Sequence, residues 1–199
     1  LEQEYEVGRQ APIEAVRSVD GTVKYLFQVG TAGAIESVYI PSEDGERATL
    51  CISSQVGCKM NCLFCMTGKQ SYTANLTANE ILNQIYALPE FDKLTNLVFM
   101  GMGEPLDNYD NVMKFLRLVN APEGLNISLR NISLSTCGLV PKMYDLAQEN
   151  LPVTLSVSLH APNDEIRQQT MPIARVYPMD ELLKAIEDAL GHSRHHIEV

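Results

Sequence analysis

The pattern that most restricts the fold of this chain lies beyond residue 47, where short apolar runs alternate with longer segments that have one apolar face. The runs suit strands buried on both faces, and the longer segments have the spacing of amphipathic helices. This order predicts parallel strands with right-handed crossovers, in either a barrel or an open doubly wound sheet. Strands are expected at 48–53, 97–100, 131–136, 153–159 and 195–199, and helices at 77–88, 109–119, 139–149 and 179–190.

The first 47 residues have a different pattern. Residues 22–29 and 34–40 are rich in β-branched and aromatic side chains and flank a glycine-bounded turn, which predicts a β-hairpin. The sequence thus divides into an N-terminal extension, 1–47, and a β/α portion, 48–199. Because the chain begins with Leu1 and stops within an expected strand, we expect it to be a portion of a longer protein.

Composition excludes several classes of protein. With 45% hydrophobic and 20% charged residues, the chain has the balance of a globular protein rather than a disordered or fibrous one. A net charge of -10 would repel nucleic-acid phosphates, so charge alone makes nucleic acid a poor partner for these 199 residues taken by themselves, and this conclusion does not extend to a longer protein. The chain lacks both a signal-peptide pattern and an apolar run of about 18 residues. We therefore expect a cytoplasmic protein with no membrane association.

Four of the five cysteines fall within a short segment, and their odd number without an export signal favours metal or redox chemistry over a disulfide framework. Cys58, Cys62 and Cys65 have the spacing C-x3-C-x2-C. Three thiolates on one short loop can hold three irons of a [4Fe–4S] cluster and leave the fourth iron open to a ligand. A zinc site completed by Cys51, or thiols without metal, are the alternatives, and zinc is disfavoured because a second C-x2-C pair is missing.

The other unusual segments also follow expected strands directly. They are 101–105, 136–138 and 160–163. Because parallel strands end at the same edge of a sheet or barrel, these segments should meet in one site. Glycines in 101–105 allow a ligand to approach the backbone, and Glu104 can accept a hydrogen bond from an amino group. Taken alone, this segment could equally be a tight turn with an exposed carboxylate.

The cysteine triplet, with an aromatic residue before its third member, resembles the signature of the radical S-adenosylmethionine superfamily. Four longer motifs are similar to the ribosomal RNA adenine-C2 methyltransferases that also modify transfer RNA, at 50–58, 98–105, 134–138 and 157–164. The resemblance extends from about Val23 to the end of the chain. It implies a partial (β/α)6 barrel, truncated after about four βα units, with the hairpin as an N-terminal extension. A related subfamily that methylates adenine C8 shares much of this pattern and stays an alternative.

The resemblance also implies cofactors and partners. The [4Fe–4S] cluster would bind to the cysteine triplet, and S-adenosylmethionine to Gly103, Glu104, Ser135, Ser158, Leu159 and His160. Taken singly, the serines and the histidine would more commonly satisfy nearby backbone groups. The implied partners are 23S ribosomal RNA, transfer RNA and an external electron donor.

Two further residues gain roles only from the resemblance. Glu36 matches the family's proton-accepting glutamate, although a solvent-facing carboxylate would explain it equally well. Cys51 matches the cysteine that releases the product by forming a disulfide with a cysteine near the family's C-terminus. Neither that cysteine nor a methyl-carrying one is present, and Cys137 is interpreted as incidental. The 199 residues alone are therefore not expected to complete methyl transfer. A zinc-stabilised RNA-binding module without catalysis is the alternative from another functional class.

Overall fold

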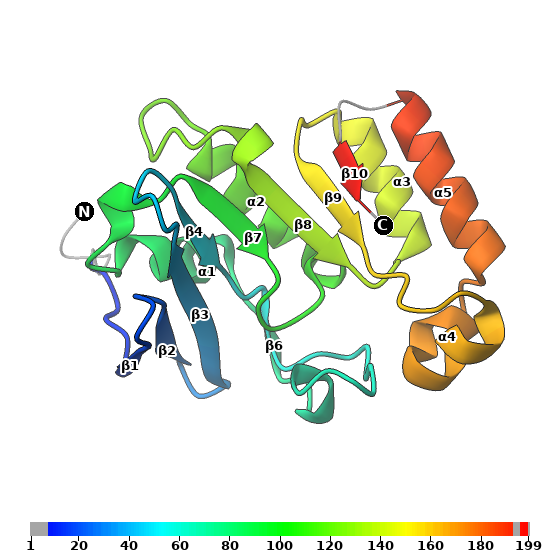
Figure 1. The fold of residues 1–199 in the computed structure, drawn as a ribbon, viewed down its shortest axis with the longest axis horizontal. Coiled ribbons are helices and arrows are strands. Elements are labelled where there is room, and N and C mark those ends of the chain that lie inside the picture. Colours follow the sequence, from blue (N-terminus) through cyan, green and yellow to red (C-terminus); the bar gives the residue numbers. More distant parts are fainter. Residues whose placement is uncertain (1–7, 193–195, 199) are drawn as a thin grey trace.

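The computed structural model describes residues 8–192 and 196–198 and shows a mixed α/β fold (Figure 1). Within this part of the chain, eight strands form one sheet. In spatial order they are β1 (Glu14–Arg17), β2 (Val23–Val29), β3 (Gly33–Pro41), β4 (Ala48–Cys51), β7 (Asn96–Phe99), β8 (Ile132–Thr136), β9 (Thr154–Val157) and β10 (His196–Glu198). Two short strands, β5 (Gln55–Val56) and β6 (Ala74–Asn75), pair with each other.

Strands β4, β7, β8, β9 and β10 are parallel neighbours, which confirms the parallel sheet expected from the alternating pattern. Of the last expected strand, residues 195 and 199 lie outside the described residues. Strands β1 to β4 pair antiparallel, so the expected hairpin continues into the parallel strands within one sheet. Barrel closure and the division after residue 47 stay predictions.

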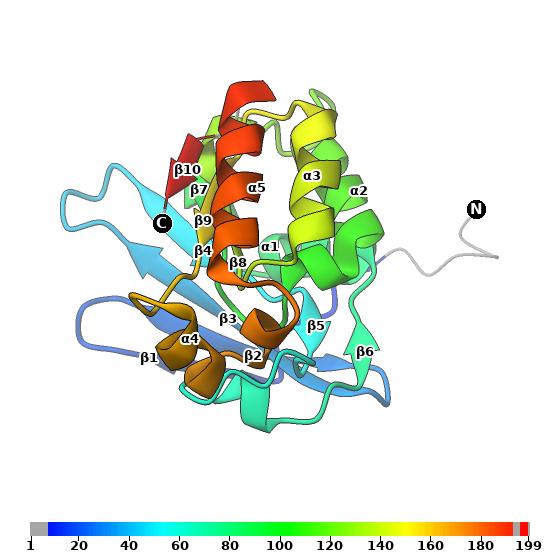
Figure 2. The same ribbon diagram turned by 90° about the vertical axis from the view of Figure 1, so that its right-hand side faces the viewer.

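Helices α1 (Ala78–Tyr86), α2 (Tyr109–Val119), α3 (Val140–Glu149) and α5 (Met179–His192) lie on one side of the sheet (Figure 2). Helix α1 begins with the expected capping box, in which Thr77 and Glu80 bond each other's backbone N–H groups. Helix α5 continues one residue beyond Gly191, where the sequence predicts its end. No helix in the described ranges combines the length and apolarity that a membrane span needs.

Several short elements were not expected from the sequence. Helix α4 (Asp164–Thr170) follows the carboxyl end of β9 (Figure 1), and β1 forms the exposed edge of the sheet. Single turns of 3-10 helix are η1 (Thr67–Lys69), η2 (Phe91–Lys93), η3 (Pro105–Asn108), η4 (Leu129–Asn131) and η5 (Pro172–Arg175). Such short segments contain too few residues for a periodic pattern.

Alternation along the strands gives the sheet two different faces. The face beneath the helices carries fully buried apolar side chains, among them Ile35, Leu50, Leu97, Leu134 and Leu155. The opposite face carries partly exposed and more polar residues, among them Glu36, Cys51, Ser133, Ser135 and Ser156. The carboxyl ends of β7, β8 and β9 border this second face, and the candidate site lies there.

Candidate active site

A cavity of about 800 Å³ lies at the carboxyl ends of β7, β8 and β9. Its volume is within the range of roughly 300–1,000 Å³ that small-molecule and cofactor sites occupy. Nine of the residues expected at the site line it: Cys58, Cys62, Cys65, Gly103, Glu104, Ser135, Ser158, Leu159 and His160. The fold thus brings together segments that are up to about a hundred residues apart.

The cysteine loop owes its path to glycine. Gly57 has a φ of +75°, and a Cβ there would lie 2.3 Å from the carbonyl oxygen of Ser71, so no larger residue fits. This turn directs Cys58 into the cavity wall. The loop is closed by a hydrogen bond from the Cys65 N–H to the Cys62 carbonyl, 3.0 Å, and the Leu63 N–H donates to the Thr170 carbonyl on α4, 2.8 Å.

Burial makes the thiols poor anions in the protein alone. It raises the pKa of Cys58 to about 11, and it raises the pKa of Cys62 with a smaller contribution from the neighbouring Cys65. A bound metal offsets this cost because its positive charge favours the thiolate. Across the described residues, no three His, Cys, Asp or Glu side chains converge as they would around a single metal ion. The three thiols line one large cavity.

Glu104 is buried, and its carboxylate is held by two backbone groups. Oε1 accepts from the Leu106 N–H at 3.0 Å, and Oε2 accepts from the Cys137 N–H at 2.8 Å. Burial nevertheless raises the pKa of Glu104 above its ordinary value, since loss of water outweighs these bonds. Each carboxylate oxygen has a second lone pair, so Glu104 can still accept from an amino group in the cavity.

Gln55, which the sequence did not single out, shapes the turn that carries Glu104. Its Oε1 accepts from the Glu104 N–H at 2.9 Å, and its Nε2 donates to Asp107 at 2.7 Å and to Asn75 at 2.8 Å. Gly103 has a φ of +99°, and a Cβ there would lie 2.6 Å from the Cβ of Gln55. The turn at residues 103–104 therefore packs directly against the buried side chain of Gln55.

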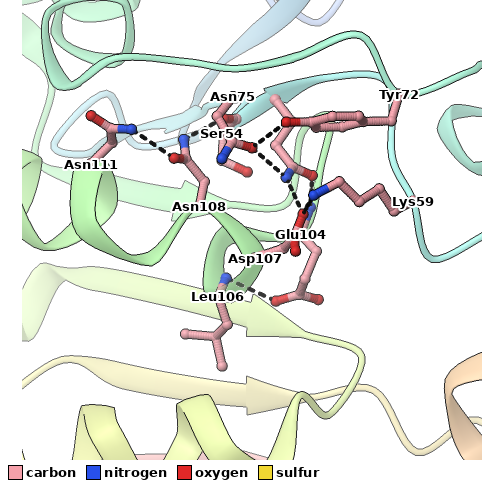
Figure 3. A network of polar contacts seen from close by, with 10 residues as sticks. Ser54, Lys59, Tyr72, Asn75, Glu104, Leu106, Asp107, Asn108 and Asn111 are labelled. Atoms are coloured by element: carbon pink, nitrogen blue, oxygen red, sulfur yellow. Dashed lines mark hydrogen bonds and ion pairs between the residues drawn. The ribbon is translucent and has the colours of Figure 1, made fainter. Parts of the chain in front are cut away.

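The same network extends to the cysteine loop (Figure 3). Lys59, directly after Cys58, forms an ion pair with Asp107 at 2.8 Å, and its ammonium group lies 4.2 Å from the ring centre of Tyr72. Asp107 thus joins the loop that carries the thiols to the turn that carries Glu104. The network depends on contacts between distant residues, and the sequence contains no periodic or motif signal for it.

His160 connects the end of β9 to the cysteine loop. Its ring meets the ring of Phe64 edge to face, with the centres 4.7 Å apart. Its φ of +54° is uncommon for a residue with a side chain. Nearby, the Ser158 N–H donates to the Thr136 carbonyl at 2.9 Å, which ties the ends of β9 and β8 together.

Glu36 and Cys51 are not among the residues that line the cavity. The Glu36 carboxylate is about half exposed and pairs with Lys24 at 2.9 Å. Burial raises the pKa of the Cys51 thiol, and all five cysteines are free, so the structure does not support a disulfide. Both side chains lie on the same face of the sheet as Ser135, where Cys51 pairs across the strands with Val38. Their chemical roles stay predictions.

Cys137 has a structural place that the sequence interpretation missed. It lines the cavity, and its N–H is one of the two donors to Glu104. Its position directly after an expected strand could have indicated from the sequence that it lies at the site. As a buried thiol it has a pKa raised well above the ordinary value, mainly by burial and next by Glu104.

The family model described as the Radical SAM superfamily matches residues 52–197, which is most of the chain. The chain belongs to the radical SAM superfamily. The matched range contains every cavity residue named above, while Glu36 and Cys51 precede it.

Individual proteins show the same relationship. A Bacteroides fragilis (strain YCH46) protein named probable dual-specificity RNA methyltransferase RlmN is 53% identical over 188 residues, 94% of this chain and 54% of the relative. A protein of the same name from Thermoanaerobacter pseudethanolicus is 48% identical over 183 residues, 92% of this chain and 53% of the relative. The chain therefore spans about half the length of these relatives.

A solved structure is also similar. The crystal structure of a radical SAM methyltransferase from Sphaerobacter thermophilus has a TM-score of 0.89 and 41% sequence identity, covering 95% of this chain and 57% of the other. The mixed α/β arrangement is thus shared with an experimentally determined member of the superfamily.

Membership of the radical SAM superfamily implies a [4Fe–4S] cluster and S-adenosylmethionine, and the cavity residues fit both. Three thiols face one cavity, which matches a cluster with three protein ligands and one open iron. Glycine at position 103 leaves the backbone accessible, and the buried Glu104 offers an acceptor beside the thiols. The remaining volume is lined largely by apolar groups, which suits the adenosyl portion of the ligand.

Proposed function

We propose that this protein is an RNA methyltransferase that acts on C2 of adenine in 23S ribosomal RNA and in transfer RNA, through a methylated-cysteine intermediate. One observation carries the proposal: the three thiols and the buried Glu104 line the same cavity. The relatives named RNA methyltransferases support the choice of substrate class. The methyl-carrying cysteine would lie outside these 199 residues.

The residues that line the cavity would bind the cluster and S-adenosylmethionine. Cys58, Cys62 and Cys65 would hold the cluster, and Glu104 would accept a hydrogen bond from the amino group of S-adenosylmethionine. The remaining contacts to that ligand would come from Gly103, Ser135, Ser158, Leu159 and His160. When bound, the cluster and its ligand supply one-electron cleavage of a carbon–sulfur bond and abstraction of a hydrogen atom.

Glu36 would accept the proton from adenine C2. Cys51 would release the product by forming a disulfide with the methyl-carrying cysteine, which breaks that cysteine's sulfur–carbon bond to the RNA and leaves the electron pair on the released nucleotide. Their place on the open face of the sheet, the face that also carries Ser135, supports these roles. Glu36 would have to give up its hydrogen bond from Lys24 before it takes a proton. Cys51 would have to become a thiolate, and burial opposes this until a partner approaches.

We infer further that β4 and β7 to β10 are strands of a partial (β/α)6 barrel, with residues 1–47 as its extension. The parallel order of these strands supports this inference. An enzyme of ribosomal and transfer RNA would work in the cytoplasm, and it would receive electrons from an external donor protein.

The test begins with anaerobic reconstitution, which should give about four irons per chain. Reconstituted full-length protein is then incubated with reductant, methyl-labelled S-adenosylmethionine and either 23S ribosomal RNA or transfer RNA. Mass spectrometry of the digested RNA should show 2-methyladenine. Exclusive 8-methyladenine would show C8 specificity, and uptake of zinc without iron would support the binding-module alternative.

Cysteine variants sharpen the test of the ligand set. Cys62→Ala should lose the cluster, whereas Cys51→Ala should retain it and lose only product formation. Equal loss of iron from both variants would overturn the three-ligand assignment. Cys51→Ala is a matched control because it removes a partly buried thiol seven residues before Cys58 on the same chain segment.

A further inference from the structure

Arg167 is a fully buried arginine on α4 without an acidic partner. Its side chain is inaccessible to solvent, and among the ion pairs of the described residues none involves it. Its Nη2 donates to the Cys137 carbonyl at 2.8 Å and its Nη1 to the Tyr177 carbonyl at 3.4 Å, while its Nε has no hydrogen-bond partner. A buried charge that lacks an opposite charge is costly, so this one calls for an explanation.

The guanidinium lies directly behind the wall of the cavity. The carbonyl that it binds belongs to Cys137, which lines the cavity and whose N–H donates to Glu104. The helix that carries Arg167 also accepts, through the Thr170 carbonyl, the hydrogen bond from Leu63 in the cysteine loop. Arg167 therefore stands between the loop that carries the thiols and the loop that supports Glu104.

The ionisable groups that interact with Arg167 are two thiols that line the cavity and one carboxylate. The Cys137 and Cys62 thiols and Asp164 are the groups whose negative charge it would feel. Asp164 accepts a hydrogen bond from the Met179 N–H at 2.8 Å instead of pairing with Arg167. Once Cys58, Cys62 and Cys65 are thiolates, the cavity holds net negative charge, and a buried cation behind its wall is weakly screened from it.

We propose that Arg167 is a positioning residue that supplies the buried countercharge for an anionic cluster in this cavity and holds the Cys137 segment against Glu104. The proposal rests on the proposed function, because that function places thiolates and a cluster there. It explains why the arginine is buried without a carboxylate partner, since its opposite charge would belong to the bound group.

The test compares Arg167→Gln with Arg167→Lys in the reconstituted full-length holoprotein. Both replacements can donate to the Cys137 carbonyl, and only lysine keeps the charge. Arg175→Gln is the matched control, since Arg175 is exposed on the neighbouring turn η5. Iron per chain, thermal unfolding and the reduction potential of the cluster, followed by electron paramagnetic resonance, are measured for each variant.

We expect Arg167→Gln to shift the reduction potential of the cluster to more negative values, because an electron added to the cluster loses a nearby positive charge. Iron retention should fall severalfold, because the thiolates lose the same countercharge. Arg167→Lys should restore the potential toward that of the unmodified protein, and Arg175→Gln should leave it unchanged. A lower unfolding temperature with an unchanged potential in Arg167→Gln would show a purely structural role and overturn the proposal.

A second variant covers the case in which Arg167→Gln does not fold. Asp164→Asn removes the negative charge near Arg167 and keeps an oxygen that can accept from Met179, so the potential should shift to less negative values. No shift, or the opposite one, contradicts the proposal. Failure of the unmodified protein to take up iron would overturn the proposed function together with this inference, whereas normal iron content with an unchanged Arg167→Gln potential would overturn this inference alone.

Discussion

The two faces of the sheet use neighbouring residues of the same strands for different purposes. On β7 and β8, Leu97 and Leu134 are fully buried beneath the helices, while the residues next to them in sequence, Val98 and Ser133, lie on the open face. The helix-covered face removes apolar area from water, which stabilises the fold. The open face keeps polar and reactive groups accessible. Neighbouring residues of one strand thus belong to the buried core and to the face that borders the candidate site.

The largest effect is expected from breaking the helix-covered face. Leu97→Ala should reduce the free energy of unfolding by about 2–5 kcal/mol, because it removes buried methyl groups and leaves a cavity. Ser133→Ala, on the open face of the adjacent strand, should change it by less than about 0.5 kcal/mol. Urea denaturation of the two variants measures the difference. Similar losses would show that both faces contribute equally to stability.

The next effect concerns ligand binding at the open face. Glu104→Gln should weaken S-adenosylmethionine binding by about 1.5–3 kcal/mol, roughly 10- to 150-fold, since it removes a charge-assisted hydrogen bond. Iron content should stay the same, because the proposed cluster ligands are the three cysteines and not Glu104. Calorimetry on cluster-loaded protein measures the affinity. Unchanged affinity at equal iron content would remove Glu104 from the ligand site.

The same carboxyl group predicts a pH dependence of stability. Burial raises the pKa of Glu104 in the folded protein, so the folded state binds more protons than the unfolded state above the ordinary glutamate pKa. Its contribution is therefore present at lower pH and is lost as the pH rises through the raised pKa. In metal-free protein, Glu104→Gln should flatten the fall of unfolding free energy with pH in this window. An identical slope in both proteins contradicts the expected linkage.

A smaller stability effect is expected at Gln55, which supports the turn from behind. Gln55→Met keeps the volume but leaves the Glu104 N–H without its acceptor, which should cost about 1–3 kcal/mol. Ligand affinity should fall with it, because the turn that carries Glu104 loosens. Denaturant unfolding and calorimetry report the two quantities. Normal ligand affinity in a destabilised Gln55→Met variant would show that the conformation of the turn does not affect ligand binding.

The smallest effect is expected at the ion pair between Lys59 and Asp107, which is partly exposed. Lys59→Met should cost less than about 1 kcal/mol of unfolding free energy, and the loss should shrink in high salt. Unfolding at low and high ionic strength tests this. A larger, salt-independent loss would mean that Lys59 packs as part of the core instead of acting through its charge.

The sequence by itself determined the elements whose patterns are local. Helix α2 occupies the expected residues, Tyr109–Val119, because its apolar spacing and its ends are both encoded within those residues. The strands of the parallel sheet were found for the same reason. Strands β5 and β6 are too short to show a period, and the exposed residues of β1 lack an alternating pattern. Motifs at strand ends also predicted which residues meet at the cavity, since parallel strands end at one edge.

Only the tertiary structure decided what surrounds those motifs. Gln55 reaches Glu104 across 49 residues of sequence, and Arg167 reaches the Cys137 carbonyl across 30. Neither partner is encoded by a period, a cap or a spacing, because such contacts exist only once distant segments pack together. The sequence specified which motif residues line the cavity. Packing specified the buried amide and the buried cation that hold those groups in place.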